Sequence, residues 1–273
     1  MPDFSVVIPT FRRPKQLPEA LASALGQAGV DLEVFVIDDC PDGSAQDIVA
    51  GLADDRVTYI RNPRPTGGFP SIVRNLAIPR LTGAYVHFLD DDDIVPEGHY
   101  AAAKQEFERM PRTGLLFGRV EPFGDGPPEQ LEHERQYFAA AARNAARCAR
   151  FGRRLPFAGW MLFGSALLVC SAGLVRRECV TGVGGFSEDM SLWEDTEFFC
   201  RVARRFGATF VDRVTLKYRI GSPSLMHAPD PTPEQRAAER DCAHRMWAHY
   251  RRLYGMAEFM TLAALTRGVL RYL

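Results

Sequence analysis

The sequence predicts an α/β fold in which a mostly parallel central sheet is flanked by helices, with further helices at the C-terminus. Short apolar runs alternate with stretches in which apolar residues recur at helical spacing, which is the pattern of βαβ units. The 273 residues are 46% hydrophobic and 25% charged, the ordinary composition of a globular chain that can bury a large core.

The first hundred residues alternate strand and helix most regularly. A β-branched run ended by a proline predicts the first strand at 5–9, and the run EVFVI predicts the second at 33–37. Apolar residues at helical spacing, Leu17 and Leu21 among them, predict a helix over 15–28. The other elements predicted in this half are helix 45–52, strand 57–60, helix 72–78 and strand 85–89.

The pattern changes after residue 96, where helical stretches dominate and no internal repeat or sharp linker is visible. The proline-rich segment 223–233 predicts a loop. The predicted elements of this half are helix 97–110, strand 114–120, helix 129–154, a helix within 187–209, strand 210–218 and terminal helices 234–253 and 257–273.

Charge and cysteine content exclude several classes of protein. The net charge of −1 argues against nucleic acid as the main partner. The six cysteines are scattered without CxxC pairs, which suits free thiols in a reducing compartment and indicates no thiolate metal site. No basic segment followed by an apolar one opens the chain, so we expect a cytoplasmic protein without a secretory signal.

Acidic residues follow two of the predicted strands. Asp38 and Asp39 end the second strand, and four consecutive aspartates, Asp90 to Asp93, follow the strand at 85–89. In a parallel sheet these positions meet at one edge, where ligands bind. A divalent cation such as Mn²⁺ or Mg²⁺ would relieve the repulsion between the carboxylates. A solvated acidic turn is the alternative for the run of four, and turn chemistry is the alternative for the pair.

A glycine loop precedes the predicted helix 72–78. Backbone amides around Gly67 and the guanidinium of Arg74 could approach a phosphate there. No GxGxxG motif follows the first strand and no GxxxxGK[ST] motif occurs. Their absence counts against a dinucleotide-dependent oxidoreductase and a P-loop nucleotidase.

Together these segments resemble family 2 glycosyltransferases, which have the GT-A fold with a Rossmann-like sheet. The resemblance covers roughly residues 4–99 and 180–219. It rests on SVVIPTFRRP, EVFVIDDCPDGS, TGGFPSIVRNLAI, AYVHFLDDDD and GGFSEDMSLWEDTEFFCRVAR, in the order typical of the family. Each motif is weak alone, and the ordered set is specific.

The resemblance implies roles for individual residues. Asp90-x-Asp92 matches the DxD motif, so Asp92 would bind the metal directly and Asp90 would face the ribose or the metal. Glu194-Asp195 matches the position of the catalytic base, which would be Asp195; the alternative is a pair of acids that favours a helix N-terminus. The residues expected to hold the nucleotide sugar are Pro9, Thr10, Phe11, Arg12, Asp38, Asp39, Gly67, Arg74, Asp90 and Asp91, and those expected on the acceptor side are Trp160 and Trp193. Core packing is the alternative for Trp160.

The resemblance also implies the reaction. It is that of an inverting, metal-dependent transferase that moves a sugar, with a UDP-sugar as the favoured donor, to a hydroxyl of a glycan, glycolipid or small-molecule acceptor. A nucleotidyltransferase and a binding protein without activity are the alternatives. The sequence departs from the family pattern at Cys40-Pro41 and at Ile220-Gly221, where many relatives carry a metal-binding His. His227 could substitute, although most lone histidines bind no metal.

The sequence also predicts how the chain is divided into domains. We expect a transferase domain over 1–222, with a donor half 1–99 and an acceptor half 100–222, and a helical extension over 223–273. The extension could pack on its own domain, on a twin subunit or on the inner face of a membrane.

The stretch 155–175 has no charged residue and is long enough to cross a bilayer. A span there would separate Asp92 from Asp195, so we expect a loop, a buried element near the acceptor and a core strand.

Overall fold

The computed structural model describes residues 1–164, 167–221 and 232–270. It contains a seven-stranded sheet with the order β3-β2-β1-β4-β6-β5-β7. The strands are β1 (Phe4–Thr10), β2 (Leu32–Asp38), β3 (Val57–Arg61), β4 (Tyr85–Phe88), β5 (Leu115–Gly124), β6 (Leu174–Arg176) and β7 (Ala208–Ile220). Among these strands only β6 runs antiparallel to its neighbours. The predicted fold class is therefore confirmed.

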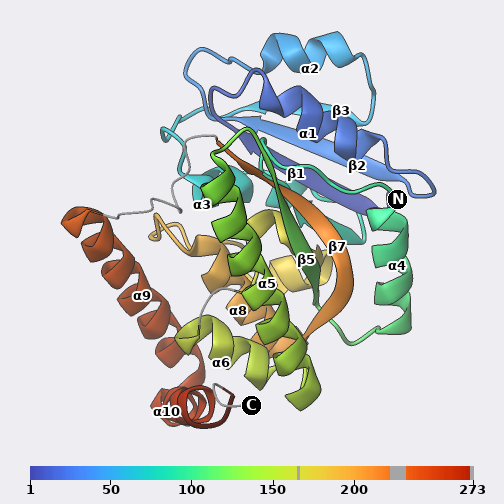
Figure 1. Ribbon diagram of the computed structural model, residues 1–273. Helices are drawn as coiled ribbons and strands as arrows, with labels where there is room; N and C mark the ends of the chain where they lie inside the picture. The colour runs from blue at the N-terminus through green and yellow to red at the C-terminus, as the bar shows by residue number, and fades with distance from the viewer. Residues whose placement is uncertain (165–166, 222–231, 271–273) are drawn as a thin grey trace.

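The helices of the first half cover the sheet as the alternating pattern predicted. They are α1 (Gln16–Leu25), α2 (Gln46–Leu52), α3 (Pro70–Asn75) and α4 (His99–Arg109). Figure 1 shows α1 and α2 beside β1, β2 and β3, with α4 at the opposite end of β1 from α3. The predicted helix 72–78 is shorter than expected at its C-terminus, because the chain passes into a 3₁₀ turn at Ile78–Arg80.

The second half is more helical. Its helices are α5 (Pro128–Phe151), α6 (Leu155–Phe163), α7 (Arg177–Val183), α8 (Glu194–Phe206), α9 (Pro233–Tyr254) and α10 (Met256–Leu265), followed by a π-helical turn at Thr266–Leu270. In Figure 1, α5 crosses in front of β5 and β7, and α9 and α10 lie together at the lower left. Gly118 marks a bulge in β5, where a Cβ atom would lie 2.5 Å from Thr215 Cγ2.

The first part of the charge-free stretch 155–175 does not have the predicted structure. Residues 155–163 form the helix α6 rather than a loop, and α7 was not predicted at all. The rest of the stretch supplies the expected buried segment and the short strand β6. Along the described residues, no helix combines the length and the apolar character needed to cross a bilayer.

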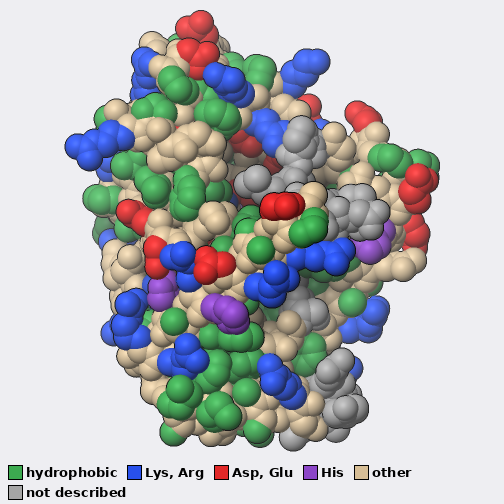
Figure 2. All heavy atoms as spheres, turned by 90° about the vertical axis from the view of Figure 1, so that its left-hand side faces the viewer, with side chains coloured by type: hydrophobic (Ala, Val, Ile, Leu, Met, Phe, Trp, Pro, Cys, Tyr) green, Lys and Arg blue, Asp and Glu red, His purple; other side chains and the backbone are tan. Residues whose placement is uncertain are grey.

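The C-terminal helices pack against α6. Phe259 and Leu262 of α10 are buried, and Gly159 of α6 allows a close approach, since a Cβ atom there would lie 2.6 Å from Thr266 Oγ1. The exposed hydrophobic side chains of this region are Leu253, Met256, Met260 and Leu265. Figure 2 shows the side of the molecule that lies at the left in Figure 1, and hydrophobic and basic side chains are mixed at its lower end. Contact of this surface with a membrane or a twin subunit stays a prediction.

Candidate active site

A cavity of about 740 Å³ opens where β1, β2 and β4 end and α8 begins. It has the size usual for small-molecule sites. Its lining brings together residues predicted from distant parts of the sequence: Pro9, Thr10, Phe11, Asp39, Gly67, Arg74, Asp90, Asp91, Asp92, Trp193, Glu194 and Asp195. Most of the predicted donor residues, three of the four consecutive aspartates and the Glu-Asp pair therefore share one cavity.

The carboxylate of Asp39 organises the glycine loop at one end of the cavity. It accepts hydrogen bonds from Asn62 Nδ2 (2.6 Å), from the amide and hydroxyl of Thr66 (3.0 and 2.8 Å) and from the Gly68 amide (2.6 Å). Burial would raise the pKa of Asp39, but these hydrogen bonds outweigh it and keep the pKa below its usual value. Gly67 and Gly68 have φ values of 79° and 94°, which suit glycine and let the loop fold over the carboxylate.

Asp38 lies behind the cavity and supports the neighbouring loop. Its carboxylate accepts hydrogen bonds from the amides of Cys40 (2.9 Å) and Ala45 (2.8 Å) and from the Tyr59 hydroxyl (3.1 Å). It is fully buried and is not among the residues that line the cavity. This placement agrees with a supporting role, in which Asp38 shapes the turn that carries Asp39.

Of the two consecutive arginines after β1, Arg13 is the one that reaches the acidic run. Arg12 was expected at the site, but its backbone has φ 55° and its guanidinium lies 5.4 Å from the Phe11 ring, outside the cavity lining. Arg13 lines the cavity, with Nη2 3.7 Å from Asp92 Oδ2. The left-handed residue turns the chain so that the second arginine of the pair faces the acids, which the sequence motif could not indicate.

The four aspartates do not form a solvated turn. Asp91 and Asp93 are buried, and the Asp90 amide donates a hydrogen bond to the Ser171 hydroxyl (3.0 Å). Burial, with the charge of Asp92 as a smaller cause, raises the pKa of Asp91 to about 7. Burial and the charge of Asp90 also raise the pKa of Asp92. The folded chain therefore disfavours the ionised forms of Asp91 and Asp92.

Arg74 joins the acidic run to the Glu-Asp pair. Its Nη2 donates to Asp90 Oδ1 (2.7 Å) and its Nη1 to Glu194 Oε1 (2.8 Å), while its side chain is only 3% exposed. The guanidinium also lies 5.4 Å from the centre of the Phe186 ring. We expected Arg74 beside the nucleotide base or phosphate, and the structure gives it two carboxylate partners within the same cavity.

Asp195 stands in the first turn of α8. Burial and the charge of Glu194 raise its pKa to about 7, although Arg74 and the Thr196 amide act in the opposite direction. Tyr137 of α5 lines the same cavity, and burial together with the charge of Asp195 raises its pKa to about 12. A carboxylate with a pKa near neutrality can accept a proton at physiological pH and release it afterwards.

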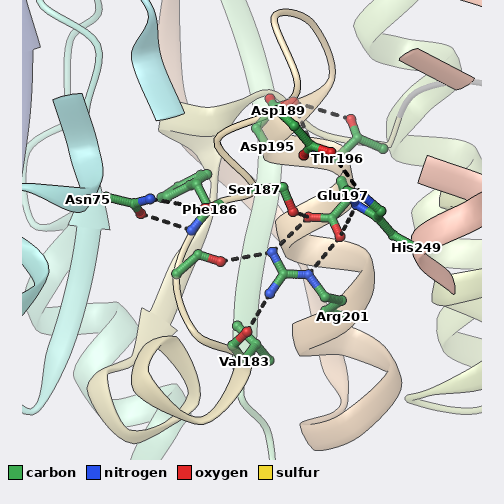
Figure 3. Close-up of polar contacts among 11 residues, drawn as sticks. Asn75, Val183, Phe186, Ser187, Asp189, Asp195, Thr196, Glu197, Arg201 and His249 are labelled. Atoms are coloured by element: carbon green, nitrogen blue, oxygen red, sulfur yellow. Dashed lines mark hydrogen bonds and ion pairs between the residues drawn. The ribbon is translucent and has the colours of Figure 1, made fainter. Parts of the chain in front are cut away.

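A polar network holds the start of α8 in place (Figure 3). Glu197 accepts hydrogen bonds from Arg201 Nε (2.8 Å), from Arg201 Nη2 (2.7 Å) and from the Ser187 hydroxyl (2.9 Å). His249 of α9 lies between two acids, with Nε2 3.2 Å from Asp189 Oδ2 and Nδ1 3.5 Å from Glu197 Oε1. The network therefore links α9, which carries His249, to the first turn of α8, which carries Asp195.

The histidine in this network predicts a pH-dependent contribution to stability. The hydrogen bond to Glu197 is the largest cause that raises the pKa of His249 above 6.5. Its contribution is therefore fully present below about pH 6.5 and is lost as the pH rises through the folded-state pKa. We expect His249→Gln to lower the midpoint of urea unfolding more at pH 6 than at pH 9. His133→Gln, at an exposed position on α5, is the control, and an equal effect of His249→Gln at both pH values would contradict this account.

Only one of the two predicted acceptor residues lines the cavity. Trp193 lines the cavity, whereas Trp160 is buried within α6 and is not among the lining residues. His227 falls outside the described residues. Sequence reasoning missed Tyr137, Met246 and Trp247, which reach the cavity from helices α5 and α9. Their helical spacing identified them only as parts of amphipathic helices, and tertiary packing brings them to the site.

Comparison with known proteins agrees with this arrangement. The fold is that of the GT-A glycosyltransferases, and acidic residues after β2 and β4 share one cavity with the carboxylates at the start of α8. The sequence model described as "Glycosyl transferase family 2" matches residues 5–164, more than half of the chain. The chain therefore belongs to glycosyl transferase family 2.

Several curated relatives are named as glycosyltransferases. The chain is 35% identical over 108 residues to the GalNAc(5)-diNAcBac-PP-undecaprenol beta-1,3-glucosyltransferase of Campylobacter jejuni, an alignment that covers 39% of this chain and 35% of that protein. It is 31% identical over 136 residues to the poly(ribitol-phosphate) beta-N-acetylglucosaminyltransferase TarS of Staphylococcus aureus, with coverages of 49% and 24%. The chain thus spans about a third or less of the length of these two relatives.

Solved structures share the fold over nearly the whole chain. TarS 1–349 from Staphylococcus aureus in complex with UDP-GlcNAc matches with a TM-score of 0.62 and 16% identity, covering 97% of this chain and 91% of that one. The mannosyltransferase PcManGT from Pyrobaculum calidifontis, in complex with GDP-Man and Mn²⁺, matches with a TM-score of 0.59 and 16% identity, with coverages of 99% and 82%. At these identities the likeness shows the fold alone.

Proposed function

We propose that this chain is an inverting, metal-dependent glycosyltransferase that uses a nucleoside-diphosphate sugar, with a UDP-sugar as the favoured donor. The observation that carries the proposal is the double ion pair of Arg74, which joins Asp90 of the acidic run to Glu194 beside Asp195 in one cavity. The named activities of TarS and of the Campylobacter jejuni relative support it. The acceptor is a hydroxyl of a glycan, glycolipid or small molecule.

The acidic run fits a divalent cation. The donor atoms are carboxylate oxygens. Burial, with the neighbouring carboxylates as smaller causes, raises the pKa values of Asp91 and Asp92, and a bound cation would stabilise their ionised forms. Among the described residues, no three acidic, imidazole or thiol groups enclose a metal by themselves. Such a site suits Mg²⁺ or Mn²⁺, which are commonly held by one or two carboxylates together with substrate phosphates. Asp92 would hold the ion, with Asp90 beside it.

The chain's own residues divide the work of the reaction. A bound cation would supply Lewis-acid stabilisation of the diphosphate leaving group. Asp195 takes the proton of the acceptor hydroxyl as that oxygen forms its bond to the anomeric carbon of the donor. The bond from this carbon to the diphosphate oxygen breaks, and its electron pair leaves with the nucleoside diphosphate. Displacement from the opposite side inverts the anomeric centre.

Donor binding tests the proposal. We expect UDP-sugars with Mn²⁺ to raise the melting temperature, because a ligand that binds only the folded state stabilises it by mass action. GDP- and dTDP-sugars belong in the same panel of thermal-shift measurements. If no nucleotide sugar of the panel raised the melting temperature in the presence of metal, the proposed function would be wrong.

Asp92→Asn separates metal binding from folding. Because the pKa of Asp92 is raised in the folded chain, replacing it with a neutral amide should leave the melting temperature without ligand unchanged or higher. In the wild type we expect UDP to raise the melting temperature more when Mn²⁺ is present than when it is absent. This difference should disappear in Asp92→Asn. Asp125→Asn, in the exposed turn before α5, should behave as the wild type in both measurements. If Mn²⁺ still raised the melting temperature of UDP-bound Asp92→Asn as much as that of the wild type, Asp92 would not be a metal ligand.

A further inference from the structure

We propose that the acceptor carries an apolar hydrocarbon group next to its reacting hydroxyl, and that a wall of the cavity formed by α6 and α9 binds this group. The inference rests on the proposed function, because it assigns the second half of the same cavity. The wall, here called the apolar wall, consists of Met161, Leu162, Leu167, Leu168, Met246 and Trp247.

The composition of the apolar wall differs from that of the rest of the cavity. The donor side carries Asp39, Arg74 and the acidic run, whereas the apolar wall has aliphatic side chains and one indole. Arg267 also lines the cavity, and its guanidinium lies 5.6 Å from the centre of the Phe163 ring. The cavity therefore has a charged side and a hydrocarbon side.

The apolar wall is held by contacts that do not depend on a ligand. Trp247 Nε1 donates a hydrogen bond to the Leu162 carbonyl (2.9 Å), so the only polar group of the indole is already used. The rings of Phe163 and Trp247 lie 6.1 Å apart, and Phe259 of α10 packs against both. A wall fixed in this way offers hydrocarbon surface without a cost of reorganisation.

The apolar wall lines the same cavity as Asp90, Glu194 and Asp195. Leu167 and Leu168 lead directly into the 3₁₀ turn Cys170–Ala172, whose Ser171 hydroxyl accepts a hydrogen bond from the Asp90 amide. Trp193, which also lines the cavity, comes immediately before Glu194 and Asp195. An acceptor whose hydroxyl meets Asp195 therefore has the apolar wall beside it.

The chemistry of this wall favours a hydrocarbon over a sugar. Hydroxyl groups removed from water must find hydrogen-bond partners, and the side chains of the apolar wall provide none. An alkyl chain or an aromatic ring needs no such partners and gains from burial against aliphatic side chains. A glycan acceptor that extends along this wall would be bound poorly.

Filling the wall tests the inference. Ala243 of α9 lines the cavity, and Ala243→Trp should block it, while Ala248→Trp places the same residue at an exposed position of the same helix. Calorimetric titration compares octyl β-D-glucopyranoside below its micelle concentration with methyl β-D-glucopyranoside. A parallel titration with the phenyl glucoside distinguishes a ring from an alkyl chain.

The expected result is at least tenfold tighter binding of the octyl or the phenyl compound than of the methyl compound, since burial of about two methylenes corresponds to such a factor. Ala243→Trp should remove this gain and Ala248→Trp should keep it. Equal binding of all three glucosides, or the same loss in both variants, would overturn the inference.

Titration of UDP with Mn²⁺ on the same three proteins separates this inference from the proposed function. Binding of UDP should be unchanged in both variants, because Ala243 belongs to α9, whereas most of the residues proposed to hold the donor lie at or just after the ends of β1, β2 and β4. If UDP failed to bind while the glucoside gain depended on Ala243, the proposed donor would be wrong and the apolar wall would stand.

Discussion

Asp195→Asn should lower the rate of sugar transfer by about 10²–10⁴-fold, the usual contribution of a general base. The amide cannot accept the proton of the acceptor hydroxyl. Since folding raises the pKa of Asp195 to about 7, its charge at pH 8 lowers the stability of the folded chain. The variant lacks this charge and should be as stable as the wild type or more stable at pH 8. Kinetic assay at saturating donor, together with urea unfolding, measures both effects.

The pH dependence gives the second half of this prediction. The base must be ionised to act, so the wild-type rate should rise with pH and level off above about 7. Affinity for UDP and Mn²⁺ should be unchanged in Asp195→Asn, which separates catalysis from donor binding. If the variant kept the full transfer rate, Asp195 would not be the base.

Arg74→Met should be the most destabilising single substitution at the site. It removes both ion pairs and leaves Asp90 and Glu194 close to Asp195 without a cation, and loss of one partner from a buried ion pair costs about 3–5 kcal/mol. Asp90 is about one third exposed, so water offsets part of this loss. We expect the free energy of unfolding to fall by about 3 kcal/mol at pH 8. The fall should be smaller at pH 5, where Asp195, whose pKa is raised to about 7, is neutral.

The double variant Arg74→Met/Glu194→Gln provides the matched control. Removing the charge of Glu194 should restore part of the stability, so the two substitutions should not add. Arg74→Met should also move the rise of the pH–rate profile to higher pH, because Arg74 lowers the pKa of Asp195. A free energy of unfolding within about 0.5 kcal/mol of the wild type, the usual range for surface substitutions, would exclude this role for Arg74.

The sequence predicted the donor half well because local signals there agree. Apolar strands such as β2 end directly in acids, and parallel strands bring their carboxyl ends to one edge. Asp39 and Asp92 could therefore be placed near each other from the order of strands alone. The helices between these strands carried clear helical spacing.

The acceptor half was predicted less completely, for physical reasons. In α6 the six consecutive residues from Phe157 to Leu162 are all buried, and the helix has no charged residue, so it lacks the polar face from which periodicity is recognised. The turn at Arg12 depends on a single left-handed residue, which decides that Arg13 faces the acids. Trp247 reaches the cavity only because α9 packs on α6, a contact between segments 85 residues apart.

The most direct measurement follows the anomeric protons of a UDP-sugar by NMR while the chain, with Mn²⁺, transfers the sugar to water or to an added acceptor. For an α-linked donor, our account predicts that the β-configured product forms first and that a chelator stops the reaction. Initial formation of the α-configured product, or the same rate in the presence of the chelator, would contradict it.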